Sequence, residues 1–297
     1  MKKDSNVYIF LYSVVLVVVV AVLLAVASTA LRPAQERNIE MEKRLDILKA
    51  IGVEGEVDAL PMSRQGAVSK LYDKFITERL AVNGEGDILE GQDAFAIDLR
   101  PELKLGAAEQ KLPVFVAHLS DGSTKYVFPL AGQGLWGPIW GYISLDEDMD
   151  HIYGVSFGHK GETPGLGAEI VSGWFRGQFK GKEIFSGSSF VSVSVLKGAG
   201  ASEGNPNAID GISGGTLTSQ GVEKMLMDCL SAYKPFIEKV KAGGVPVAAS
   251  VEDGRASGEK AEEVEAASQE KELNTSEDAP AGETPEAQMQ KEEKNNG

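Results

Sequence analysis

An uncharged apolar run near the start of the chain constrains its fold more than any other feature. Residues Val7 to Ala27 carry no charged side chain, and a run of this length is enough for a helix to span a bilayer. The small residues Ala25-Val26-Ala27 leave open a cleavable signal peptide. Signal peptides usually have a shorter apolar core, and here a helical pattern continues to Ile51. We therefore expect a retained transmembrane helix over residues 7–30.

Charged residues beside this run predict its orientation. Lys2 and Lys3 precede it, and basic flanks favour the cytoplasmic side of a membrane. Asp4 beside them and Arg32 after the run reduce this charge difference. We expect residues 1–6 to be cytoplasmic and the chain after the span to lie on the other side.

The negative charge of the chain is concentrated at its C-terminal end. The 297 residues have a formal net charge of −15, and residues 251–297 hold fourteen acidic and five basic side chains. A segment with low hydrophobicity and high charge cannot offset the entropy lost on ordering. We therefore predict a disordered acidic tail over residues 243–297, and we expect no nucleic acid as a partner.

The few cysteines and histidines argue against a metal site. Cys229 is the only cysteine, so neither an intramolecular disulfide nor a cysteine-bound metal or iron–sulfur centre can form. The three histidines, His118, His151 and His159, do not have the spacing of metal ligands. We expect no metal site, and a buried, packing role for Cys229.

Between the span and the tail, residues 31–242 have the pattern of one α+β domain. Helical periodicity covers residues 38–51 and 67–76 and returns in a final helix with an apolar stripe from Val222 to Ile237. Short β-like runs punctuated by glycine lie between them. Strands in a block between flanking helices predict a mostly antiparallel sheet. The expected strands are Val114–Leu119, Tyr126–Pro129, Ile139–Leu145, His151–Phe157 and Phe190–Leu196.

A segment rich in glycine and hydroxyl groups lies directly before the final helix. It reads Asp210-Gly-Ile-Ser-Gly-Gly-Thr-Leu-Thr-Ser219. The first amides of a helix have no partner within it, and the helix dipole favours negative charge at this end. The segment therefore predicts an anion site. Helix capping by Thr216 is the simpler alternative, with Thr218 and Ser219 as competitors for that role.

This segment resembles the flavinylation motif of a family of FMN-binding subunits. The family includes the C subunit of the Na⁺-translocating NADH:quinone reductase and the G subunit of the Rnf electron-transport complex. Its pattern is Asp, a spacer, Ser/Thr-Gly-Ala-Thr, and a Ser or Thr two positions on. In this chain Gly215 replaces the Ala. The N-terminal span, Asn38–Gly52, Gly132–Gly141 and Glu162–Gly167 follow the family order, so the resemblance covers most of residues 1–240.

The resemblance implies a set of cofactor-binding residues. In the family the motif threonine is esterified through its hydroxyl to the phosphate of FMN, and Thr216 stands at that position. Two other segments approach the flavin ring in the family, a Glu-Thr-Pro-Gly-Leu-Gly loop and a glycine-rich stretch with tryptophans. The implied residues are Asp210, Ser213, Gly214, Gly215, Thr216 and Thr218 in the motif, Glu162, Thr163, Gly165, Leu166 and Gly167 in the loop, and Trp136 and Trp140 in the stretch.

The resemblance also implies a function and partners. Members of the family carry electrons one at a time between redox centres of neighbouring subunits, in a six-subunit complex of the bacterial inner membrane. Their flavin domain is periplasmic, and a separate flavin transferase attaches FMN, using FAD and Mg²⁺. The implied role is that of an electron carrier during NADH oxidation, quinone reduction and sodium export. No catalytic residue is expected in the carrier itself.

Three alternatives remain open at this stage. The chain is either the sodium-pump carrier or its Rnf equivalent, and the membrane span and early helix favour the sodium pump. A membrane-anchored scaffold that has lost its flavin is possible from another class. Gly211-Ile-Ser-Gly-Gly215 also matches the G-x-S-x-G nucleophile elbow of hydrolases. In that fold the catalytic histidine follows the serine, whereas all three histidines here precede Ser213.

Overall fold

The computed structural model describes residues 6–243. The first helix, α1 (Asn6–Ala50), combines the predicted membrane span and the helical pattern after it in one element. It is the one helix of the described part that is long and apolar enough to cross a membrane. The predicted tail lies outside the described residues, apart from residue 243.

The two ends of α1 have different surroundings. Its apolar stretch exposes large side chains such as Phe10 and Leu24, as expected for a helix whose partner is lipid. At the other end, Ile47, Leu48 and Ile51 are fully buried. The same helix therefore provides the candidate anchor and part of the core of the domain.

The domain is built on one six-stranded antiparallel sheet, with strand order β2-β1-β3-β4-β5-β6. The prediction of an α+β fold with a mostly antiparallel sheet is confirmed. Four expected strands are present as β3–β6, but β1 was not expected. The strands are β1 (Ile76–Val82), β2 (Ile88–Leu89), β3 (Leu112–His118), β4 (Thr124–Gln133), β5 (Pro138–Leu145) and β6 (Ile152–His159).

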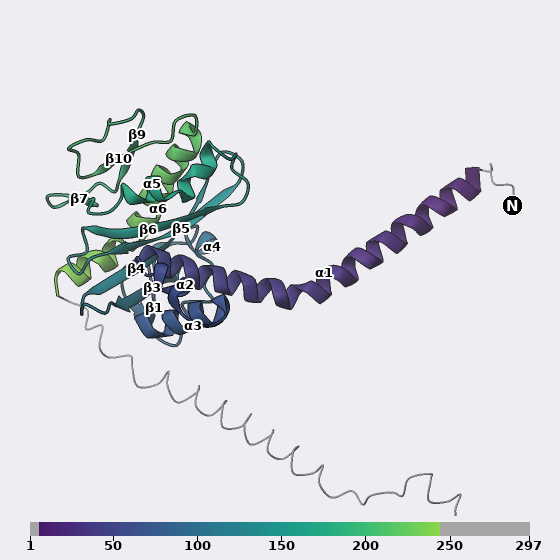
Figure 1. The fold of residues 1–297 in the computed structure, drawn as a ribbon, viewed down its shortest axis with the longest axis horizontal. Coiled ribbons are helices and arrows are strands. Elements are labelled where there is room, and N and C mark those ends of the chain that lie inside the picture. Colours follow the sequence, from purple (N-terminus) through teal and green to yellow (C-terminus); the bar gives the residue numbers. More distant parts are fainter. Residues whose placement is uncertain (1–5, 244–297) are drawn as a thin grey trace, which may run out of the picture. The chain divides into compact units, whose positions relative to one another are not determined.

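Helices cover both faces of this sheet (Figure 1). On one face, the end of α1 and α3 (Arg64–Phe75) pack against Phe115, Val127 and Tyr142. On the other face, α6 (Thr216–Lys241) crosses β4, and α5 (Gly173–Gly177) lies against β6. The Tyr233 hydroxyl of α6 donates a 2.9 Å hydrogen bond to the Pro113 carbonyl, which fixes this helix on the sheet.

The final helix follows its predicted pattern closely. Its apolar stripe is buried from Val222 to Ile237, including Cys229, whose side chain is fully enclosed. Phe128 of β4 packs against Tyr233 and Phe236 of this helix. This packing holds the start of α6, which carries the glycine-rich segment, at a defined place over the sheet.

Short elements complete the domain, and one of them corrects an expected strand. Residues 190–196 do not form one strand, because Ser192 has a left-handed backbone (φ 59°) and interrupts the run. The amides of Val191 and Ser192 both donate to the Ile184 carbonyl. The short elements are α2 (Gly55–Ala59), α4 (Leu99–Glu102), η1 (Ala107–Glu109), η2 (Gly167–Val171), β7 (Phe185–Ser186), β8 (Ser189–Phe190), β9 (Ser194–Leu196) and β10 (Ala208–Asp210).

Candidate flavin site

The glycine-rich segment forms a tight turn between β10 and α6. The Gly215 amide donates to the Ile212 carbonyl at 3.0 Å, and the Ile212 amide donates to Ser219 Oγ at 3.0 Å. Ser219 lies in the first turns of the helix, so this bond ties the turn back onto the helix it precedes. The helix start is therefore held rigidly, with its first amides directed toward the turn.

Thr216 is the first residue of α6 and is half-exposed. The N-cap position belongs to Gly215, which has no side chain to form a capping hydrogen bond. Thr216 therefore does not occupy the N-cap position, and the alternative in which it caps the helix does not hold in this structure. The Thr216 hydroxyl instead stands at the surface, beside a helix end that favours a negative charge.

Gly214 and Gly215 allow the Glu162–Gly167 loop to approach the turn closely. Gly214 has φ +74°, a conformation that other residues rarely adopt, and a Cβ atom there would lie 2.6 Å from Leu166 Cδ2. A Cβ atom at Gly215 would lie 2.9 Å from Ile212 Cγ2 and 3.2 Å from the Gly167 nitrogen. The Gly-Gly pair therefore sits directly against the Glu162–Gly167 loop.

Glu162 connects three segments that the sequence analysis assigned to the site. Its Oε2 atom accepts a 2.6 Å hydrogen bond from the Thr218 hydroxyl, and its Oε1 atom accepts a 2.9 Å bond from the Trp136 amide. Its own amide donates to Nδ1 of His159 at 3.2 Å. Glu162 is buried, and its expected role as a cofactor-binding residue stays a prediction.

The remaining loop residues are open to solvent beside the motif. Thr163, Gly165 and Leu166 are exposed, whereas Gly167 is buried under the helix start. Leu166 is 41 % exposed, and Trp136, in the turn between β4 and β5, is 69 % exposed. These apolar side chains come from two of the segments that Glu162 joins, and Leu166 lies against Gly214 of the motif.

Trp140 lies on the other face of the sheet. It follows the same alternation along β5 as Tyr142, which packs with the α1 and α3 cluster. Together with Ile39 and Asp46 of α1 it lines a cavity of about 510 Å³. Ile139, one residue earlier, points toward Gly134 and the side of the sheet that carries α6. The structure therefore brings Trp136, and not Trp140, to the motif.

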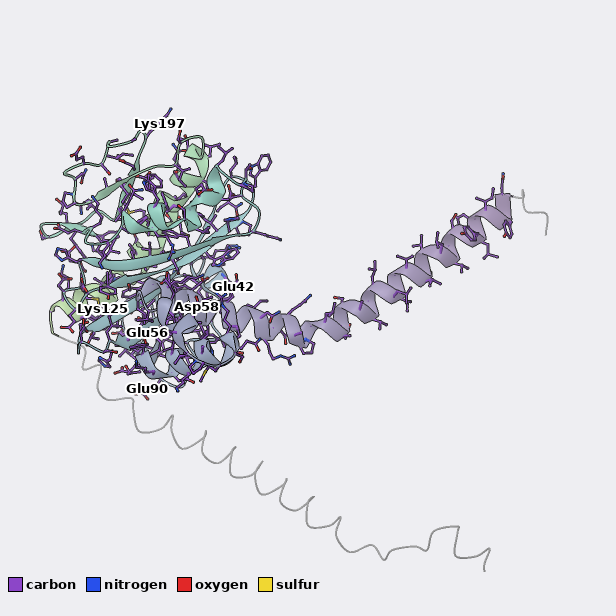
Figure 2. The ribbon with its side chains drawn as sticks, viewed as in Figure 1. Glu42, Glu56, Asp58, Glu90, Lys125 and Lys197 are labelled. Carbon is purple, nitrogen blue, oxygen red and sulfur yellow. The ribbon has the colours of Figure 1, made fainter. Side chains whose placement is uncertain are left out.

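The carboxylate of Asp210 is directed to a neighbouring loop. It accepts hydrogen bonds from the amides of Gly200 (2.5 Å) and Ser202 (2.8 Å), and these bonds hold its pKa below the ordinary value. This loop follows β9 and begins at Lys197, which is labelled in Figure 2. Gln178, which the sequence analysis did not single out, exchanges two hydrogen bonds with the Asp210 backbone. The hydrogen bonds of Asp210 and Gln178 thus hold the end of β10 in place directly before the motif.

The structure offers little for metal chemistry within the described range. No group of three or more His, Cys, Asp or Glu side chains in residues 6–243 is arranged to hold a metal ion. His159 accepts the Glu162 amide, and His151 pairs with Asp148 at the surface. The Ser213 side chain is exposed at the turn, and every histidine precedes it in the chain.

A family model described as an FMN-binding domain matches residues 134–231 of this chain. The match begins in the turn that carries Trp136, includes the Glu162–Gly167 loop and ends within α6. The three segments that meet at Glu162 therefore all fall inside the matched range.

Similar proteins share most of their length with this chain. The C subunit of the Na⁺-translocating NADH-quinone reductase of Vibrio anguillarum is 30% identical over 250 residues, which cover 78% of this chain and 94% of that protein. The corresponding C subunit of Pasteurella multocida is also 30% identical, with 82% and 97% covered.

Two solved structures share the fold. The C subunit of the same reductase from Parabacteroides distasonis has 44% sequence identity and a TM-score of 0.60, with 70% of this chain and 96% of that chain covered. NqrC of Shewanella oneidensis, at 24% identity and a TM-score of 0.58, shares the fold over 70% of this chain and 99% of that one. On this sequence identity and coverage, the chain belongs to the family of C subunits of the Na⁺-translocating NADH-quinone reductase.

Proposed function

We propose that this chain is the membrane-anchored FMN carrier of a sodium-pumping NADH:quinone reductase, with FMN bound covalently through its phosphate to the Thr216 hydroxyl. The observation that carries the proposal is the position of Thr216. It is half-exposed at the first position of a 26-residue helix, after a turn with no side-chain cap. A phosphodiester at this point keeps one negative charge, which the helix dipole and the first helical amides stabilise.

The residues around Thr216 fit a flavin. Leu166 and Trp136 provide exposed apolar surface for the ring on the side of the Glu162–Gly167 loop. Gly214 and Gly215 let that loop pack directly against the attachment turn. When bound, the flavin supplies the electron-transfer chemistry, and the protein supplies its position and surroundings. The roles of this chain are to attach the phosphate, orient the ring and limit its access to water.

Attachment requires a second protein. A threonine hydroxyl is a weak nucleophile without activation, and we propose that a flavin transferase activates Thr216 with Mg²⁺ and FAD. The Thr216 oxygen forms a bond to the phosphorus of the FMN half of FAD. The bond from that phosphorus to the AMP half breaks, so AMP leaves with the electron pair and the hydroxyl proton is released.

The carrier works only within its complex. We propose that it accepts and passes on single electrons between redox centres of partner subunits, while those subunits oxidise NADH, reduce quinone and export sodium. Helix α1 anchors the domain in the bacterial inner membrane. Lys2 and Lys3, which precede it in the sequence, favour a cytoplasmic N-terminus, and this supports a periplasmic flavin domain.

Reconstitution tests this proposal. The full-length chain is produced without a flavin transferase and then incubated with the transferase, FAD and Mg²⁺. We expect a colourless, folded protein that becomes yellow and keeps its flavin after denaturation. Thr216→Ala, treated identically, should remain colourless. Attachment from FMN alone, without the transferase, would contradict the requirement for an activated hydroxyl.

A further inference from the structure

The Glu162 side chain links the three segments around the candidate flavin site. Its two carboxylate oxygens accept from different directions, one from the Thr218 hydroxyl on α6 and one from the Trp136 amide in the β4–β5 turn. The residue itself begins the Glu162–Gly167 loop. Three segments that are far apart in sequence therefore meet at one carboxylate.

The backbone around this carboxylate encloses it tightly. A Cβ atom at Gly134 would lie 2.5 Å from Glu162 Oε1, and a Cβ atom at Gly167 would lie 2.5 Å from Oε2. The side chain is 4 % exposed. Glycine on two sides lets the backbone close over the carboxylate, so both oxygens face protein donors and not the open surface where Leu166 lies.

We propose that Glu162 is a positioning residue, which sets the flavin-side loop against the helix that carries Thr216 and does not itself contact FMN. The proposal rests on the flavin assignment above. The acceptor hydroxyl and the loop are on separate elements, and the Glu162 to Thr218 bond is the direct polar link between them. Its strength decides how firmly the loop is held beside an attached flavin.

The chemistry of the contact explains why a carboxylate suits this position. An ionised carboxylate is an acceptor at both oxygens, and it meets two donors here. Methionine has a similar length but no oxygen acceptor, so the Thr218 hydroxyl and the Trp136 amide would both lose their partner in a buried site, which is costly. Glutamine would keep the link, because its NH₂ group can donate to the Thr218 oxygen, which also accepts. Glu162→Met therefore breaks the link with little change in volume.

Amide hydrogen exchange of the loop tests the link in full-length protein without flavin. We expect exchange at residues 163 and 165–168 to rise about tenfold in Glu162→Met and in Thr218→Val, because each leaves a buried group unpaired. Thr218→Ser keeps the hydroxyl and should stay near the wild type. Glu223→Gln is the matched control, since it removes one half-exposed carboxylate from the same helix.

The double variant Glu162→Met/Thr218→Val separates a shared contact from two independent ones. If the two residues act through one hydrogen bond, the double variant should exchange no faster than about the more affected single variant. Multiplied effects of the two substitutions would overturn the proposal. Unchanged loop exchange in Glu162→Met would overturn it as well.

The visible circular dichroism of the attached flavin supplies the second readout. The variants are flavinylated by the transferase, and the signal is expressed per mole of covalent flavin. We expect the signal to fall in Glu162→Met and Thr218→Val and to persist in Thr218→Ser and Glu223→Gln. A lost signal in Glu162→Met with unchanged loop exchange would indicate direct contact with the ring and contradict the proposal. Absence of flavin from wild-type Thr216 would refute the proposed function, while the exchange data still judge the link.

Discussion

The Thr218 hydroxyl donates a 2.6 Å hydrogen bond to Oε2 of Glu162, a residue 56 positions earlier in the chain. Thr216 and Thr218 are two positions apart on a helix, so their side chains point in directions about 200° apart. Thr218 is consequently buried, whereas Thr216 is half-exposed. We therefore propose separate tasks for the two threonines of the motif, Thr216 to attach the cofactor and Thr218 to hold the surrounding loop.

The first prediction separates these tasks. Thr216→Ala should abolish in-gel flavin fluorescence under denaturing conditions and change the free energy of unfolding by well under about 1 kcal/mol, since the residue makes no capping bond. Thr218→Ala should keep covalent flavin but lower the free energy of unfolding by about 1–3 kcal/mol, because the Glu162 acceptor loses its partner. The reverse pattern of fluorescence would place the ester on Thr218.

The second prediction concerns the two glycines of the turn. Gly214→Ala should destabilise the protein strongly, because the left-handed backbone and the nearby Leu166 side chain both oppose a Cβ atom. Gly215→Ala requires a shift of the Ile212 side chain and a small adjustment at the Gly167 nitrogen, and we expect a smaller loss of about 1 kcal/mol. Thermal unfolding of both variants checks this order. An equal or inverted order would contradict the packing described for the turn.

The third prediction uses Cys229. Burial raises the pKa of this thiol to about 12, from an ordinary value of 9.0. The folded thiol keeps its proton to higher pH than the unfolded one, so its contribution to stability is complete below pH 9 and is lost as the pH rises toward 12. Tyr72 and Tyr142, whose pKa values burial also raises, contribute to the same alkaline loss.

Two measurements check the cysteine prediction. The stability advantage of the wild type over Cys229→Ala should shrink as the pH rises from 9 toward 11, while the tyrosine contribution cancels in the comparison. A thiol reagent at pH 8 should label the native protein slowly and the unfolded protein fast. Rapid labelling of the native protein would show that Cys229 is not enclosed between α6 and β4.

The fourth prediction concerns orientation in the membrane. Alkaline phosphatase fused after Ile51 or Ile237 should be active, and GFP fused at the same points should be dark, since both points follow the candidate span found within residues 6–243. A fluorescent GFP fusion after Ile237 would place the flavin domain in the cytoplasm. That result would reverse the proposed route of electrons from NADH.

Elements with a long, clear period could be predicted from the sequence. Helices α1, α3 and α6 and strands β3–β6 carry apolar patterns that local reasoning detects. Strand β1 was missed because it begins directly after α3, and its apolar residues continue the helical pattern without a break. The run at residues 190–196 alternates like a strand, but Ser192 has a left-handed backbone, and the Val191 and Ser192 amides both bond to the Ile184 carbonyl seven and eight residues earlier. The local turn thus overrides strand propensity there.

The candidate site could be predicted only in part, and for a related reason. The motif at the start of α6 has a local signature, so its place in the fold was expected. The Glu162 to Thr218 bond joins residues 56 positions apart, and no local pattern signals such a contact. Trp136 and Trp140 share one glycine-rich stretch, but a turn and the alternation along β5 send them to different places. Sequence proximity could not distinguish them.

Tandem mass spectrometry of the full-length protein, purified with its partner subunits, tests the central claim most directly. Trypsin should release one peptide from Gly198 to Lys224, which contains Ser213, Thr216 and Thr218. We predict that this peptide carries the mass of an FMN phosphoester and that fragment ions place it on Thr216. An unmodified peptide, or flavin on any other residue, would contradict the proposed attachment of FMN to Thr216.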